Sequence, residues 1–160
     1  MQEIICDVCW DGPFEWDKRD LLRNSAHVLY AIYGTHPVYG QNVLLYIGMT
    51  ETTVADRLAQ HTWLRDESDR VTIKIASIGV HPSIEAWWQA WDTLSEIDVY
   101  PRPALEIIRA VEALLIYAHQ PAYNTMGKAS LSVVKQLRIF NTGKCGSLLP
   151  ELSYAYYKES

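Results

Sequence analysis

The sequence predicts an α+β domain in which a small three-stranded, mainly antiparallel sheet is flanked by helices, in the order β-β-α-β-α-α-α. Two observations predict this class. Three short apolar runs are rich in β-branched and aromatic residues, and several longer stretches carry apolar residues at helical spacing. With 160 residues, 49% of them hydrophobic, the chain has the length of one domain and can bury a core.

The expected strands cover residues 27–33, 43–48 and 71–78. Turn-forming residues at 34–37 and 40–42 separate the first two runs, which therefore predict a hairpin with a long loop. The third run alternates apolar and more polar side chains, which is the period of a half-buried strand.

Four helices are expected in the remainder of the chain. Thr53, with Asp56 three residues later, resembles a capping box and begins a helix that runs to about Leu64. Prolines near the start of the next two segments fit the first turn of a helix. These two helices and the last one are expected over about residues 82–97, 101–120 and 129–140.

The net charge is −5, from 14 Lys and Arg against 19 Asp and Glu, which argues against a protein coated in basic charge for nucleic-acid binding. Residues 1–26 carry six acids and three bases, whereas residues 127–150 carry four bases and no acid. The basic segment is either a contact surface for a polyanion or a solvated face, and both interpretations stay open. The candidate contacts are Lys128, Lys135, Arg138 and Lys144.

The three cysteines, Cys6, Cys9 and Cys145, give an odd count that does not fit a disulfide framework. Reduced thiols are the preferred interpretation, because a zinc site would need all three and a histidine as well. No run approaches the roughly 18 apolar residues of a membrane span, and the N-terminus lacks the features of a signal peptide. A cytoplasmic protein with no membrane partner is expected.

Several polar residues lie along the expected hairpin and helices. Arg57 and His61 are four residues apart and would project from one helix face. Tyr30 and Tyr46 fall on paired strands, where side chains on the same face can cluster. Glu112 falls mid-helix among apolar neighbours, where an unpaired buried carboxylate is costly.

These residue types fit the cleavage of a phosphodiester. A hard cation such as Mg²⁺ often takes only one or two carboxylates and keeps its waters, so Glu112 alone is compatible with a metal site. The planar guanidinium of Arg57 suits phosphate oxygens. A tyrosine can activate water only after its phenol loses a proton, and a nearby cation would lower its pKa from about 10.

These residues belong to a longer pattern of short motifs that follow one another along the chain. It comprises V-L-Y at 28–30, Y-I-G at 46–48, R-x-x-x-H at 57–61, Glu112, and P-x-Y-N at 121–124. This arrangement resembles the GIY-YIG nuclease family, with Val28 where the first glycine of the family motif usually stands. The resemblance covers about Val28–Asn124. It implies an α+β core of about residues 27–125. The single domain expected from the chain length, 1–160, would then carry an N-terminal extension (1–26) and a basic, helical C-terminal extension (127–160) outside that core.

The resemblance also implies a role for each matching residue. Tyr30 would be the general base that activates water, and Tyr46 would line the site, although the sequence does not decide which tyrosine is the base. His61 would hydrogen-bond a tyrosine or relay a proton.

On the substrate side, the resemblance implies that Arg57 contacts phosphate, Glu112 is the single metal-binding carboxylate and Asn124 supports the site. The expected protein is a Mg²⁺- or Mn²⁺-dependent endonuclease that hydrolyses DNA, either restriction-like or associated with mobile elements or defence. Its partners would be the DNA substrate and either a second copy or a larger complex. The alternatives are an RNA-directed nuclease, and an inactive nucleic-acid-binding or protein-interaction module on the same fold.

Overall fold

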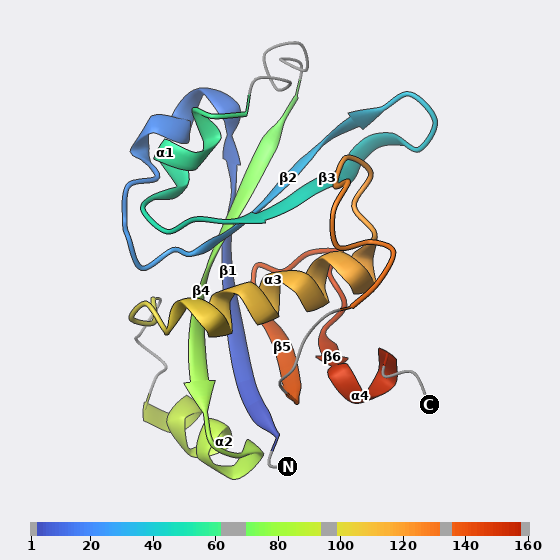
Figure 1. The fold of residues 1–160 in the computed structure, drawn as a ribbon. Helices are drawn as coiled ribbons and strands as arrows, with labels where there is room; N and C mark the ends of the chain where they lie inside the picture. Colours follow the sequence, from blue (N-terminus) through green and yellow to red (C-terminus); the bar gives the residue numbers. More distant parts are fainter. Residues whose placement is uncertain (1–2, 62–69, 94–98, 132–135, 158–160) are drawn as a thin grey trace.

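A curled, six-stranded mixed sheet forms the centre of the molecule (Figure 1). The computed structural model describes residues 3–61, 70–93, 99–131 and 136–157. The strand order is β3-β2-β4-β1-β5-β6; β1 and β5 pair in parallel, and the other neighbours are antiparallel. The strands are β1 (Ile4–Glu15), β2 (Leu29–His36), β3 (Gly40–Met49), β4 (Thr72–His81), β5 (Leu137–Gly143) and β6 (Glu151–Ser153).

Helical segments cover both faces of this sheet. They are η1 (Trp16–Leu21), α1 (Val54–Leu58), α2 (Ile84–Thr93), α3 (Leu105–His119) and α4 (Tyr154–Tyr157). Within the described residues, no helix is long and apolar enough to cross a membrane.

The expectation of a small three-stranded sheet is wrong, because three further strands belong to the same sheet. The expected strands are present as β2, β3 and β4, and β2 and β3 form the expected hairpin. Its loop is short, since only residues 37–39 separate the two strands. The main addition is β1, which lies in the middle of the sheet between β4 and β5.

β1 was not predicted from the apolar pattern of the sequence, because the carboxylate of Asp7 interrupts its apolar run. Asp7 is only 3% exposed, and donors from distant parts of the chain satisfy it. Trp87 Nε1 and the Tyr100 hydroxyl donate to Oδ2, over 3.1 and 2.5 Å, and the Thr142 hydroxyl donates to Oδ1. A buried charge is tolerated when hydrogen bonds replace its water, so Asp7 is compatible with a central strand.

The helix expected over residues 129–140 is also wrong. Residues 129–131 are not helical, residues 132–135 lie outside the described part of the chain, and residues 137–143 form β5. Along β5 the buried residues alternate with half-buried ones, which is the period of a strand. Ile4 pairs with Leu137 in parallel register, so this segment is held by β1.

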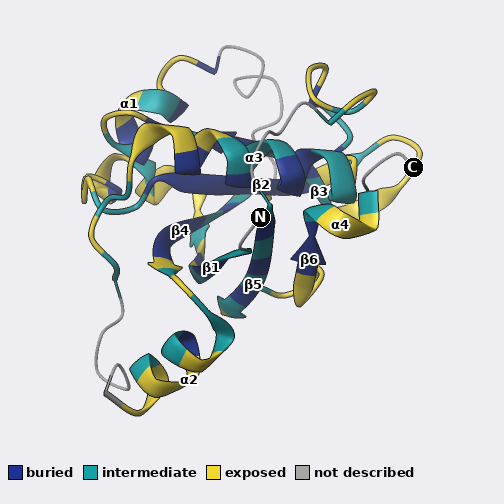
Figure 2. Cartoon of the chain, turned by 60° about the horizontal axis from the view of Figure 1, so that its bottom comes forward, coloured by how far each residue is buried: buried dark blue, intermediate teal, exposed yellow. Residues whose placement is uncertain are grey.

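The two faces of the sheet have separate apolar clusters. Leu29, Ala31 and Tyr33 of β2 contribute to the larger cluster, which α3 covers; Tyr30 and Ile32 contribute to the smaller one. Val54 and Leu58 of α1 pack into the smaller cluster, so α1 and α3 lie on opposite faces. Figure 2 shows the buried residues along the strands and in stripes on α3.

Three of the expected helices are present, with changed ends. The Thr53 hydroxyl caps α1 as expected, but the helix ends at Leu58 rather than near Leu64; residues 62–64 lie outside the described part. α2 begins after Ser83, whose hydroxyl accepts the Ala86 N–H, and its expected end at 94–97 also lies outside that part. α3 ends at His119, before Pro121, as expected.

Candidate active site

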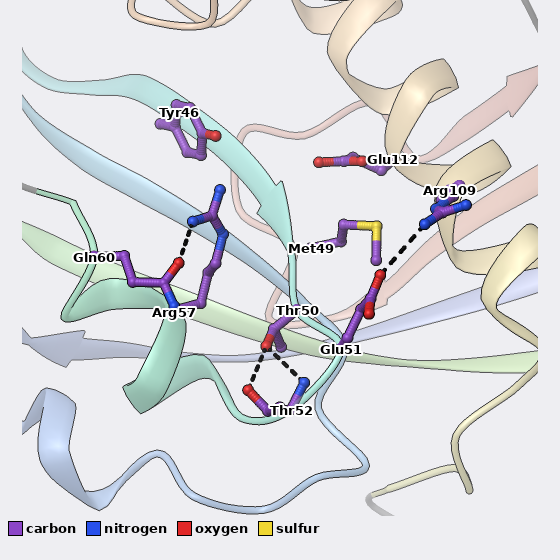
Figure 3. Close-up of a pocket in the computed structure, with 9 residues that line it drawn as sticks. All are labelled: Tyr46, Met49, Thr50, Glu51, Thr52, Arg57, Gln60, Arg109 and Glu112. Atoms are coloured by element: carbon purple, nitrogen blue, oxygen red, sulfur yellow. Dashed lines mark hydrogen bonds and ion pairs between the residues drawn. The ribbon is translucent and has the colours of Figure 1, made fainter.

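A pocket of about 490 Å³ lies at the β3 edge of the sheet, between α1 and α3 (Figure 3). These two helices pack on opposite faces, so their side chains can meet only around an edge. The loop of residues 50–53, which joins β3 to α1, completes the wall. The lining residues are Tyr46, Met49, Thr50, Glu51, Thr52, Arg57, Gln60, Arg109 and Glu112.

Gly48 makes room for the two tyrosines beside this pocket. It is the direct partner of Tyr30 in the β2–β3 ladder. A Cβ at Gly48 would lie 2.5 Å from the Tyr30 hydroxyl oxygen and 2.8 Å from a ring carbon of Tyr46. The two rings stack with centroids 6.0 Å apart. The structure thus brings Tyr30 and Tyr46 together, but Tyr30 is fully buried and only Tyr46 lines the pocket.

Tyr30 makes a short hydrogen bond to His61, with 2.6 Å between its hydroxyl oxygen and Nε2. His61 also packs edge-on against Tyr46, with ring centroids 4.8 Å apart. Burial, and next the positive charge of Arg57, lowers the pKa of His61 to about 4. The imidazole is therefore neutral near pH 7, and its Nε2 can accept a hydrogen bond from the Tyr30 hydroxyl.

Burial raises the pKa of both phenols above the ordinary value. Proximity to Tyr46 adds to the rise at Tyr30, whereas at Tyr46 the largest opposing effect is the positive charge of Arg57. Both tyrosines are therefore protonated near neutral pH. Of the two tyrosines, only Tyr46 lines the pocket. A cation bound there in addition to Arg57 would favour the Tyr46 phenolate.

Arg57 reaches the pocket from the last turn of α1. The Thr53 hydroxyl begins this helix by accepting the Asp56 N–H over 3.1 Å, and Arg57 Nη1 donates to Gln60 Oε1 over 2.7 Å. His61 lies beyond the end of the helix, where its N–H donates to the Leu58 carbonyl over 3.1 Å. The expectation that Arg57 and His61 share a helix face is wrong, because α1 ends at Leu58. Both side chains nevertheless lie near Tyr46.

Glu112 lies on α3 and lines the same pocket. Burial raises the pKa of its carboxyl to about 7, against the opposing effects of a hydrogen bond from the Met49 backbone and of the charges of Arg57 and Arg109. Among the described residues, no group of three or more His, Cys, Asp or Glu side chains could hold a metal ion. A half-buried carboxylate at an open pocket nevertheless fits Mg²⁺, which needs one or two carboxylates and retains water ligands.

Asn124 does not line the pocket. Its side chain accepts the Ile47 N–H over 2.9 Å and donates to the Ile47 carbonyl over 3.0 Å. Asn124 is therefore bound to the backbone of β3 one residue after Tyr46. It supports the strand that presents the pocket tyrosine, and it has no direct access to a substrate.

Two charged residues of the pocket, Glu51 and Arg109, were not among the sequence-based candidates. They form an ion pair with 3.3 Å between Glu51 Oε1 and Arg109 Nη2. The spacing of Arg109 and Glu112, three residues apart on one helix, could have indicated that they share a face. Arg102 supports the loop from outside the pocket, donating to the backbone carbonyls of Thr50 and Thr52 over 3.1 and 2.8 Å.

The basic C-terminal candidates do not gather at the pocket. Arg138 pairs with Glu3 and Glu151, over 3.2 and 3.6 Å, and Lys144 pairs with Asp11 over 3.5 Å. The Lys128 ammonium donates to the Pro121 carbonyl over 2.8 Å. Lys135 lies outside the described residues.

The cysteines are all free thiols. Cys6 and Cys9 are three residues apart on β1, so their side chains point to opposite faces of the sheet. Burial raises the pKa of Cys6 to about 12, which disfavours the thiolate that a zinc ion needs.

Comparison of the chain with models of known families finds no match, and comparisons with curated proteins and with solved structures find none either. The similarity to GIY-YIG nucleases therefore depends on the ordered residues of this sequence alone.

Proposed function

We propose that this protein is a Mg²⁺- or Mn²⁺-dependent endonuclease that hydrolyses phosphodiester bonds in DNA, and that it belongs among the GIY-YIG nucleases. One observation carries the proposal. Tyr46, Arg57 and Glu112 come from three separate elements and line one pocket, with Tyr30 and His61 directly behind Tyr46. A buried core alone gives no reason to gather two guanidiniums, a half-buried carboxylate and a tyrosine–histidine pair at one edge.

The position of the tyrosines suggests how water is activated. Tyr46 faces the pocket and would take the proton from the attacking water, so we place Tyr46 rather than the buried Tyr30 next to the substrate. Tyr30, held by neutral His61, would orient the Tyr46 hydroxyl, and the phenol proton of Tyr46 would leave to the solvent of the open pocket before water attacks. This ordering requires the Tyr46 phenol to ionise, which the adjacent Arg57 favours.

Arg57 would bind the non-bridging oxygens of the scissile phosphate, on which negative charge develops during attack. Its guanidinium keeps donors for this role beyond the Nη1 group that bonds Gln60. Glu112 would hold a Mg²⁺ ion, which when bound neutralises phosphate charge and assists the leaving oxygen. The raised pKa of Glu112 implies that its carboxyl must release a proton when the metal binds.

The direct test is cleavage of a mixed pool of DNA and RNA substrates with Mg²⁺ or Mn²⁺, followed by sequencing of the ends. We expect cuts in DNA that disappear in Glu112→Ala and fall by about 10²-fold or more in Tyr46→Phe. Glu106→Gln, which changes an exposed carboxylate near the start of the same helix, is the matched control and should retain activity.

The alternatives give different results. Cuts confined to RNA would indicate the RNA-directed nuclease. A protein that binds nucleic acid and cuts none, with Glu112→Ala behaving identically, would rule out the endonuclease and favour a binding module.

A further inference from the structure

We propose that Arg109 is a second phosphate-binding residue, so that the pocket takes two successive phosphates of a polynucleotide backbone rather than a single terminal phosphate. This inference rests on the proposed function and deepens it by naming the form of the substrate. Arg57 would hold the phosphate beside Tyr46, and Arg109 would hold a neighbouring one.

The two guanidiniums approach the pocket from different walls. Arg57 extends from α1, which packs on one face of the sheet, and Arg109 extends from α3, which packs on the other. Figure 3 shows Glu112 beside Arg109 and Tyr46 above Arg57, with Met49 between the two groups. A backbone that crosses the pocket would meet one guanidinium from each wall. A single phosphate bound at Arg57 would leave Arg109 without a ligand.

Arg109 is available for such a contact. Its side chain is 64% exposed, and its ion pair with Glu51 is a single contact of 3.3 Å with a partner that is 62% exposed. Exposed ion pairs of this kind are weak, because both groups remain hydrated and flexible. A guanidinium can bind a phosphate through two parallel N–H donors, which is the stronger arrangement.

The Glu51 carboxylate therefore occupies the position on Arg109 that a substrate phosphate would take. In the free protein it neutralises Arg109 and keeps its guanidinium at the pocket wall. When nucleic acid enters, a phosphate replaces the carboxylate and Glu51 turns to solvent. Glu51 consequently lowers the affinity for a polyanion, both by competing for Arg109 and by like-charge repulsion.

The test is binding of a fluorescein-labelled DNA duplex in EDTA, which prevents turnover, measured by anisotropy over about 50–200 mM KCl. We expect Arg109→Ala to weaken binding about tenfold at the low-salt end and to reduce the slope of log K against log salt by about 0.9, the value of one phosphate contact. Arg109→Lys should restore most of the slope. Glu51→Gln should tighten binding.

Arg23→Ala is the matched control, since Arg23 is similarly exposed at 62% and paired with Asp56, but does not line the pocket. A slope in Arg109→Ala equal to that of Arg23→Ala, or weaker binding in Glu51→Gln, would overturn this inference and leave the nuclease standing if the wild type cuts DNA. A wild-type protein that does not bind the duplex at all would overturn both.

Discussion

At the residue scale, Tyr30 and Tyr46 differ in whether a substrate can reach them. Both rings lie on one face of the hairpin, against His61, but Tyr30 is fully buried and Tyr46 lines the pocket. The exposure of each ring depends on α1, which covers β2 and leaves the edge strand β3 open. A single sequence carries no signal for that arrangement, so Tyr46 could not be distinguished from Tyr30 as the pocket residue.

Gly48→Ala should disturb the site more than the volume of one methyl group suggests. The new Cβ would clash with both tyrosine rings, so either the Tyr30–His61 hydrogen bond breaks or the β2–β3 pairing shifts. We expect a loss of about 1–3 kcal/mol in the free energy of unfolding, from denaturant titration, together with a large loss of cleavage. Gly48 does not have a left-handed φ, so the clash and not backbone strain accounts for the expected loss. An unchanged free energy of unfolding in Gly48→Ala would contradict this account.

Glu112 makes the stability of the metal-free protein depend on pH. Its carboxyl has a pKa of about 7 when folded and 4.5 ordinarily. Between these values the folded state holds a proton that the unfolded state releases, so stability falls as pH rises from 4.5 to 7 and then levels off. Glu112→Gln should remove this fall, and thermal unfolding should show it about 1–3 kcal/mol more stable than the wild type above pH 7. An identical pH dependence in the two proteins would contradict the assignment.

At the element scale, the helices that were predicted correctly have local sequence signals, whereas the strands that were missed depend on pairing between distant segments. The α1 cap, the start of α2 and the whole of α3 were predictable because capping residues, prolines and helical spacing are local. β1 and β5 were not predicted, because β1 contains Asp7 and each strand is stabilised by pairing with a segment more than 100 residues away. Leu137, Arg138 and Ile139 alternate as in a strand, but Phe140 and Asn141 break the apolar pattern, so the sequence signal is short.

α1 is only five residues long, so its position depends strongly on its cap. Thr53→Ala removes the acceptor of the Asp56 N–H and should cost about 1 kcal/mol in unfolding free energy. Because Arg57 lies in the same helix, we expect weaker substrate binding as well, measurable as a raised KM. Thr125→Ala, at an exposed position outside any helix or strand, should change neither quantity.

At the scale of the whole molecule, the first strand of the chain holds the two halves of the sheet together. β1 pairs with β4 on one side and with β5 on the other, so the N-terminal segment joins the hairpin half of the sheet to the C-terminal half. It also contributes Asp7, which receives hydrogen bonds from α2, from β5 and from Tyr100.

A chain that begins at residue 16 should therefore fail to fold. It would lose the central strand and expose the apolar residues of β4 and β5 that pack against it. We expect loss of the cooperative unfolding transition in circular dichroism, and partial recovery when a peptide of residues 1–15 is added. A cooperative transition in the shortened chain alone would show that β1 is dispensable.

The contacts of residues 122–124 have a consequence for association between molecules. β3 is an edge strand, and such edges offer unpaired backbone groups to strands of other chains. Here the Ala122 and Tyr123 N–H groups donate to the Leu44 and Leu45 carbonyls, and the Asn124 amide bonds both backbone groups of Ile47. One side chain and two peptide groups thus imitate a neighbouring strand. The edge that presents Tyr46 is protected from aggregation along this stretch, yet the pocket beside it stays open to a substrate.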